Sequence, residues 1–151
     1  MASVSLTGND VVSLNGRVFH DYAAGDVAKL TFSGALVKVT PSKNGNVIYS
    51  LDVSGQMSSL ELMLLLGSSD DQYLNSLLPS PASDLATYIL IVGSFVKRVG
   101  DGQGNSTNVI YNVSGGIVTK FPEAKMSTSG DAAQSIVTWH IDFGQNSRVI
   151  M

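Results

Sequence analysis

Alternating apolar and polar residues, the pattern of half-buried β-strands, dominate this chain. In QSIVTWHIDF the odd-numbered residues from Val137 to Phe143 are apolar and fall on one face, and in NVIYSLDVS those from Val47 to Val53 do the same. The even-numbered leucines from Leu60 to Leu66 fit a further buried strand, although leucine alone would suit a helix equally well. A strand through NVIYNVSGGIVTKF is interrupted at Gly115-Gly116, where paired glycines predict a bulge or a sharp bend.

Tight-turn signals separate several of these strands. Asn15-Gly16 and Asn44-Gly45 lie between apolar runs, which is the strongest short-range signal for a β-hairpin. The glycine-rich loop from Gly100 to Thr107 joins two more strands, and Ser33-Gly34 separates DVAKLTF from ALVKVT. We therefore expect four hairpins, including one between the last two segments.

A single short helix is predicted after Gly67. Ser69 and Gln72 form a capping box, and Asp70 and Asp71 place negative charge at the positive end of the helix. Pro79 and Pro81 end it. One face of this helix carries its apolar residues, which are Tyr73, Leu74, Leu77 and Leu78.

Composition favours one domain, residues 1–151, with a surface suited to protein contacts. Only 14% of the 151 residues are charged, so much of the surface desolvates at low cost, although a weakly charged monomer fits the same numbers. The net charge is −3 and no basic stripe is present, which argues against tight nucleic-acid binding. There is no cysteine, so disulfides and thiolate metal sites are excluded.

Targeting signals are not visible in the sequence. The first ten residues, MASVSLTGND, lack the basic and apolar segments of a secretory signal. The apolar runs LELMLLL and YILIV are far shorter than the roughly 20 residues that span a bilayer. No stable membrane insertion is expected.

No residue pattern predicts catalysis, a cofactor or a metal. His20 beside Asp21 and His140 beside Asp142 are interpreted as surface or interface histidines, because no convergent ligands accompany them. The glycines of GDGQGN lie between two strands, whereas a phosphate loop precedes a helix. The chain is therefore not expected to be an enzyme.

The segment LELMLLLGSSDDQYLNSLL, a strand ending in Gly-Ser followed by a short helix, resembles the tail tube proteins of bacteriophages, particularly those with contractile tails. The strand TYILIV and the closing stretch GGIVTKFPEAKMSTSGDAAQSIVTWHIDF follow in the order of that family. The resemblance implies a mainly β fold, a sandwich or barrel with one short flanking helix. Sheets of neighbouring subunits would then join into a ring-wide inner β-barrel, and hexameric rings would stack into a tube.

The same resemblance implies partners and a location. The partners would be copies of the chain, a tail sheath protein, and baseplate and tail terminator proteins. Phage DNA would pass through the lumen without specific binding. The protein would reside in the virion, as part of the phage tail, and in the host cytoplasm during assembly.

Three surfaces are candidates under this interpretation, although each also fits ordinary solvent-exposed residues. The loop at the second Asn-Gly turn would contact the next ring through Pro41, Ser42, Lys43, Asn44, Gly45 and Asn46. Acidic side chains on sheet faces would line the lumen, namely Asp52, Glu61 and Asp142. The polar side of the helix would face the sheath through Asp70, Asp71 and Gln72.

Two alternatives stay open. A type VI secretion or tailocin tube protein has the same fold, and sequence separates these from phage tubes poorly. A β-sandwich binding module, such as a carbohydrate-binding domain, belongs to a different class. Such modules present exposed aromatic residues, whereas aromatics make up 7% of this chain and Trp139 lies on an apolar strand face.

Overall fold

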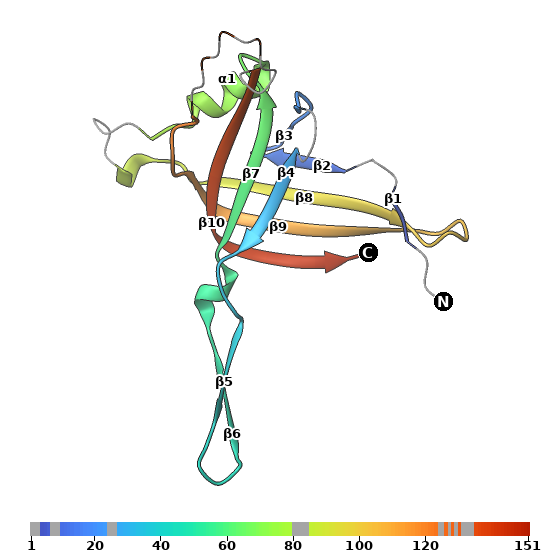
Figure 1. Cartoon of the computed structure of the whole chain (residues 1–151), viewed down its shortest axis with the longest axis vertical. Helices are drawn as coiled ribbons and strands as arrows, with labels where there is room; N and C mark the ends of the chain where they lie inside the picture. Colours follow the sequence, from blue (N-terminus) through green and yellow to red (C-terminus); the bar gives the residue numbers. More distant parts are fainter. Residues whose placement is uncertain are drawn as a thin grey trace.

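The computed structural model describes residues 4–6, 10–23, 27–79, 85–123, 126, 128, 130 and 135–151 (Figure 1). Its helices are α1 (Ser69–Ser76) and the 3-10 turns η1 (Val53–Gln56) and η2 (Leu85–Thr87). The strands are β1 (Ser5–Leu6), β2 (Val11–Leu14), β3 (Arg17–Val18), β4 (Ala28–Phe32), β5 (Val37–Pro41), β6 (Val47–Leu51), β7 (Ser58–Leu65), β8 (Ile91–Gly100), β9 (Ser106–Val118) and β10 (Ile136–Ile150).

Eight strands form one antiparallel sheet in the order β3-β2-β8-β9-β10-β7-β4, with β1 also paired to β8. The long strand β10 belongs to both halves, because its first part pairs with β7 and its later part with β9. In Figure 1, β4, β7 and the first part of β10 run along the molecule, whereas β8, β9 and the end of β10 run across it. The sheet therefore turns a corner within β10.

Glycines make this corner. Gly115 in β9 has φ +68° and lies beside Gly144 of β10. A Cβ atom on Gly116 would overlap the ring of Phe143, so only glycine lets that ring lie against β9. The bend predicted at Gly115-Gly116 is confirmed. Side-chain alternation in β10 also shifts here, because Phe143 is buried in the core and Arg148 contacts Tyr111 on the same side of the sheet.

The concave side of the bent sheet encloses one core. The even-numbered leucines of β7, the odd-numbered residues of β10 from Val137 to Phe143, and Val12 and Leu14 of β2 belong to the same buried cluster. Beyond it, an aromatic group continues toward the corner, with Tyr111 6.0 Å from Phe32 and 6.3 Å from Phe95 between ring centroids. The predicted alternation is confirmed over most of its length. Leu66 is one exception, since β7 ends at Leu65 and the Leu66 side chain is 62% exposed. The half-buried strand predicted in NVIYSLDVS is the other, because every residue of β6 is exposed and Val53 begins η1.

Helix α1 covers one end of this core. Leu74 is fully buried, and Tyr73, Leu77 and Leu78 pack at its margin, so the predicted apolar face is confirmed. The predicted start is wrong by one residue: the N-cap is Ser68, whose side chain accepts a hydrogen bond from the N–H of Asp71. Among the described residues, no helix has the length and the apolar run that crossing a membrane requires.

Three of the four expected hairpins are confirmed. Asn15 and Gly16 both have positive φ, 52° and 81°, as a type I′ turn between β2 and β3 requires. Asn44-Gly45 joins β5 to β6, and the loop after Gly100 joins β8 to β9.

The hairpin expected at Ser33-Gly34 is wrong. Strand β4 pairs with β7, and β5 pairs only with β6. Leu30 of β4 packs against the core, which holds β4 in the main sheet, and the stronger Asn-Gly turn gives β5 its partner.

Candidate assembly surfaces

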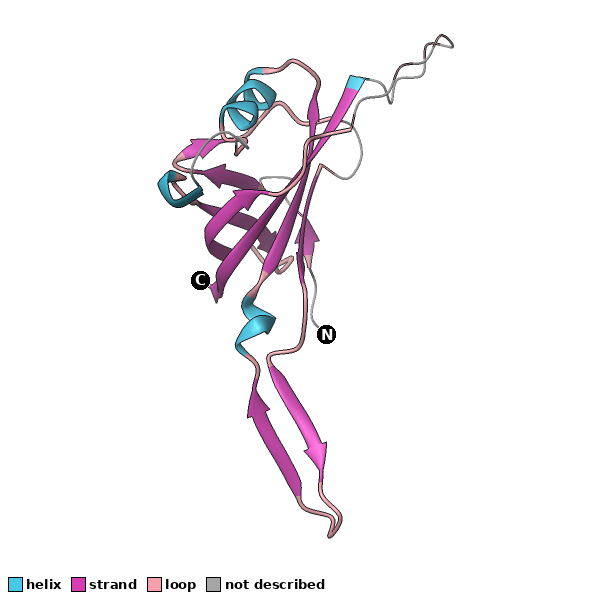
Figure 2. Ribbon diagram, turned by 90° about the vertical axis from the view of Figure 1, so that its left-hand side faces the viewer, coloured by secondary structure: helices cyan, strands magenta, loops and turns pink. Residues whose placement is uncertain are grey.

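Strands β5 and β6 form a two-stranded ribbon, residues Val37–Leu51, that extends away from the main sheet (Figures 1 and 2). We call it the arm. Its pairing register aligns Val37 with Leu51 and Val39 with Tyr49, so apolar side chains gather on one face. This apolar face of the arm consists of Val37, Val39, Pro41, Val47, Tyr49 and Leu51.

The apolar face of the arm is uncovered by the described part of the chain. Every residue of both strands is exposed, including Tyr49 at 71% and Leu51 at 76%. A two-stranded ribbon is at best marginally stable in water, and a contiguous apolar patch marks a contact site. The arm therefore has the chemistry of a segment that another chain covers.

A narrow neck joins the arm to the body. The N–H of Asp52 donates to the carbonyl of Leu36 at 2.7 Å, and the N–H of Gly55 donates to the carbonyl of Asp52 at 3.2 Å. A Cβ atom on Gly55 would overlap the carbonyl oxygen of Ala35. Backbone contacts, including this close approach, therefore hold the root of the arm.

The predicted inter-ring residues lie together at the far end of the arm. The N–H of Ser42 donates to the carbonyl of Asn46 at 2.7 Å, and Gly45 has φ +80°. Five of the six residues from Pro41 to Asn46 are exposed, and Ser42 is partly buried. The tip is thus an ordered turn at the point most distant from the core, and its role in ring contact stays a prediction.

The predicted lumen residues separate into two groups. Glu61 of β7 and Asp142 of β10 both lie on the convex side of the sheet, opposite the core, and we call this side the outer face. Glu61 has Lys29 and His140 as its cross-strand neighbours, so the charge there is mixed. Asp52 lies at the neck of the arm, away from that group.

Among the described residues, the open backbone edges of the main sheet include those of β4 and of the later part of β10. Strand β4 pairs on one side only, with β7. The later part of β10, from Gln145 to Ile150, pairs on one side only, with β9. Unpaired strand edges are templates for pairing with another chain.

Asp70 at the start of α1 joins the helix to the first hairpin. Its Oδ1 accepts hydrogen bonds from Nε and Nη2 of Arg17 at 3.2 and 3.0 Å. Its Oδ2 accepts from the backbone N–H groups of His20 and Asp21 at 2.8 and 2.9 Å. Burial raises the pKa of Asp70, but these hydrogen bonds outweigh it and hold the pKa below its ordinary value.

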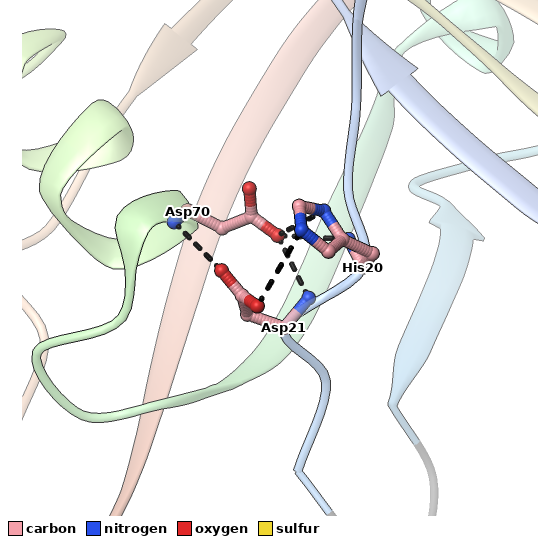
Figure 3. A group of neighbouring side chains, drawn as sticks. All are labelled: His20, Asp21 and Asp70. Atoms are coloured by element: carbon pink, nitrogen blue, oxygen red, sulfur yellow. Dashed lines mark hydrogen bonds and ion pairs between the residues drawn. The ribbon is translucent and has the colours of Figure 1, made fainter.

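Asp70, Asp21 and His20 also lie close enough together to be considered as metal ligands (Figure 3). One ligand atom from each falls within 4.8 Å of the others. However, both oxygens of Asp70 already accept hydrogen bonds, and the Arg17 guanidinium lies 3.0 Å from one of them. These contacts are those of a structural ion pair. A cation bound at this position would be repelled by the positive charge of Arg17.

The three residues predicted to face the sheath have different environments. Asp70 is fully buried, so its assignment to an outward-facing surface is wrong, because the side chain is used to hold the β2–β3 hairpin. Asp71 is partly buried and accepts a hydrogen bond from the indole N–H of Trp139 at 2.9 Å. Gln72 is exposed, and its sheath contact stays a prediction.

Sequence reasoning missed the apolar face of the arm and the Arg17–Asp70 ion pair. The alternation on both sides of Asn44-Gly45 contained the signal for the former, but Val37 and Val39 were assigned to a different hairpin. The ion pair joins residues 53 positions apart and has no local signal.

The fold of this chain is similar to that of solved components of contractile injection systems. Three solved structures share it at low sequence identity. The chain matches the tube-terminating cap of the anti-feeding prophage with a TM-score of 0.56 at 14% identity, over 97% of this chain and 90% of that chain.

The other two come from the extracellular contractile injection system PVC in its extended state. A chain of the sheath–tube complex gives a TM-score of 0.54 at 12% identity, over 94% of this chain and 87% of that one. The sheath/tube terminator gives a TM-score of 0.53 at 13% identity, over 94% of this chain and 92% of that chain. No protein-family model and no curated protein matches the sequence. The resemblance to tail tube proteins is thus confirmed at the level of the fold.

We expect Asp70→Asn to lower the free energy of unfolding by about 2–3 kcal/mol at pH 7, because it removes a charged acceptor of four hydrogen bonds. The folded-state pKa is depressed, so the wild-type advantage is present above the unfolded pKa of about 3.9 and is lost as the pH falls through the folded-state value. Urea titrations at pH 7 and near pH 3 measure this. Asp142→Asn on the outer face is the matched control, and an equal loss there would contradict the assignment.

Proposed function

We propose that this protein is a structural subunit of a phage tail or tail-like contractile particle, and that its copies form rings that stack into the inner tube. The observation that carries the proposal is the uncovered apolar face of the arm. The fold shared with injection-system tube and cap components supports the same role. A virion tail, with assembly in the host cytoplasm, is the location that follows.

Ring closure uses the open edges of the main sheet in this proposal. The edge of β4 and the edge of the later part of β10 offer unpaired backbone groups at two different places. A contact between unlike edges is heterologous, and such contacts close into rings when the rotation between copies permits. Hexameric rings with a joined inner β-barrel are the form that we propose, and closure removes the aggregation hazard of open strands.

The outer face is the proposed lining of the lumen. Glu61 and Asp142 lie there among polar neighbours, and the mixed charge leaves no row of cations that would retain phosphate groups. DNA would therefore pass through without specific binding. The other proposed partners are a tail sheath, with Gln72 on the exposed side of α1, and baseplate and terminator proteins.

A tube-terminating cap is the second candidate function. Two of the three structural neighbours are a tube-terminating cap and a sheath/tube terminator. A terminator forms a single ring, whereas a tube subunit polymerises without limit. A type VI secretion or tailocin tube fits the same fold. A carbohydrate-binding module is disfavoured, because Trp139 is 1% exposed and lies in the core.

Replacing Tyr49 and Leu51 together by serine tests the role of the apolar face of the arm. Both side chains are exposed in the single chain, so we expect its free energy of unfolding to change by no more than about 0.5 kcal/mol. Losing two apolar side chains from a contact weakens it by roughly 3 kcal/mol, which corresponds to about a hundredfold higher concentration for assembly. Sedimentation velocity across a concentration series measures the assembly of the wild-type chain and of the double variant.

Ile48→Ser is the matched control, since Ile48 is 55% exposed on the opposite face of the arm. An equal effect of this control on assembly would contradict a specific role for the apolar face. Wild-type protein that remains monomeric at high concentration, without rings or tubes in negative-stain micrographs, would overturn the proposed function as a whole.

Deleting residues 42–46 removes the tip of the arm and tests stacking. We expect soluble subunits or single rings in place of long tubes, because the tip is the part of the arm most distant from its own body. Length distributions in negative-stain micrographs give the answer. Tubes of normal length would refute an inter-ring role for the tip.

Reversing charge on the outer face, with Glu61→Lys and Asp142→Lys together, tests the proposed lumen. Cationic side chains in the conduit would attract phosphate groups, so we expect DNA delivery to slow while tubes still assemble. The release rate of DNA from phage carrying the variant measures this. The control is Gln103→Lys in the exposed β8–β9 loop, and delivery at the wild-type rate in the double variant would count against the lumen assignment.

A further inference from the structure

The arm and the body of this chain have opposite charge. The arm contains Lys38 and Lys43 and no acidic residue, so it carries +2, while the whole chain carries −3. The rest of the chain therefore carries −5. An arm that is both cationic and apolar requires a receiving surface that is both acidic and apolar.

A hollow of the described structure meets both requirements. It has a volume of about 570 Å³ and lies between α1 and the start of β10. Asp71 and Glu123 supply negative charge, and no basic side chain among the described residues lines it. Its apolar lining includes Leu66, Ile136 and Trp139.

The carboxylate of Asp71 is bonded to neutral groups in this hollow. Its oxygens accept hydrogen bonds from the Trp139 indole and the Gly67 N–H, both at 2.9 Å, and both of these donors are neutral. Two other acidic residues of the body are paired with cations. Asp70 pairs with Arg17 at 3.0 Å, and Asp10 pairs with Lys97 at 3.5 Å.

The position of the hollow excludes a contact within one chain and favours a contact between copies. Helix α1 and the arm lie at opposite ends of the long axis of the molecule (Figure 1). A second hollow of about 470 Å³ adjoins the neck of the arm, but Arg148 lines it, and its positive charge would repel a lysine at the tip. A contact from the end of one copy to the opposite end of the next is heterologous and propagates as a stack.

We propose that the hollow beside α1 receives the arm tip of a second copy of this chain, with Lys43 facing Asp71 and Glu123. The inference rests on the proposed function, because it assigns the receiving surface for the arm in a stacked tube. It uses the same side of α1 that the sheath prediction uses, so the two assignments compete.

Cysteine cross-linking tests this contact directly, because the natural chain contains no cysteine. A Lys43→Cys, Glu123→Cys double variant can form a disulfide only between copies, since a disulfide requires Cα atoms within about 7 Å and these positions lie at opposite ends of one chain. On oxidation of assembled protein we expect a ladder of dimers, trimers and larger multiples on non-reducing gels. Each single variant should give dimers at most, and Lys43→Cys with Gln103→Cys is the control pair.

A charge exchange gives an independent measurement. Lys43→Glu and Glu123→Lys should each raise the concentration needed for stacking by about tenfold, and the double variant should restore it to within about threefold of wild type. Lys97→Glu is the control for a charge reversal away from both surfaces. No rescue in the double variant, together with no ladder, would overturn the inference.

Two further outcomes separate the possible failures. If Glu123→Lys leaves tube length unchanged but abolishes co-sedimentation with the sheath, the hollow is a sheath contact, and only the inference fails. If the wild-type chain forms neither rings nor tubes, the proposed function fails, and the inference fails with it.

Discussion

The corner in β10 is the constraint on which the rest of the structure depends. Where Gly144 lies beside Gly115, the strand leaves β7 and continues along β9, so one sheet encloses the core on its concave side. The same turn ends the pairing of β10 with β7 and leaves its later part open along one edge. Folding of the single chain therefore creates the edges that assembly would use.

The arm obeys the opposite constraint. The body encloses a buried apolar core, whereas the apolar face of the arm is exposed along its whole length. Pairing between β5 and β6 fixes which side chains share that face, and the neck at Gly55 holds its root. The arm can thus present its apolar face in one orientation, although that face gains its stabilisation only when another chain covers it.

Local features of this fold could be predicted from the sequence, and long-range ones could not. The Asn15-Gly16 turn and the buried alternation through Trp139 follow from rules that act over a few residues. The partner of β4 could not be predicted, because it depends on the packing of Leu30 against a distant strand. Asp70 shows the same limit: its position in the first turn of a helix predicted an exposed carboxylate, but Arg17 and two backbone N–H groups of another segment bury it.

The candidate surfaces also contain local features that the sequence predicts and long-range features that it does not. The tip of the arm was found because turn chemistry marks it, but its significance comes from the apolar face behind it, which requires the pairing of Val39 with Tyr49 to be known. The charges of the arm and the body can be counted from the sequence, but the structure is needed to show that they lie at different ends of the molecule. Lysines near one end and unmatched carboxylates at the other give the molecule a polarity, so like ends repel and unlike ends attract. In the proposed tube, this polarity would favour an ordered stack over random association through the same exposed apolar residues.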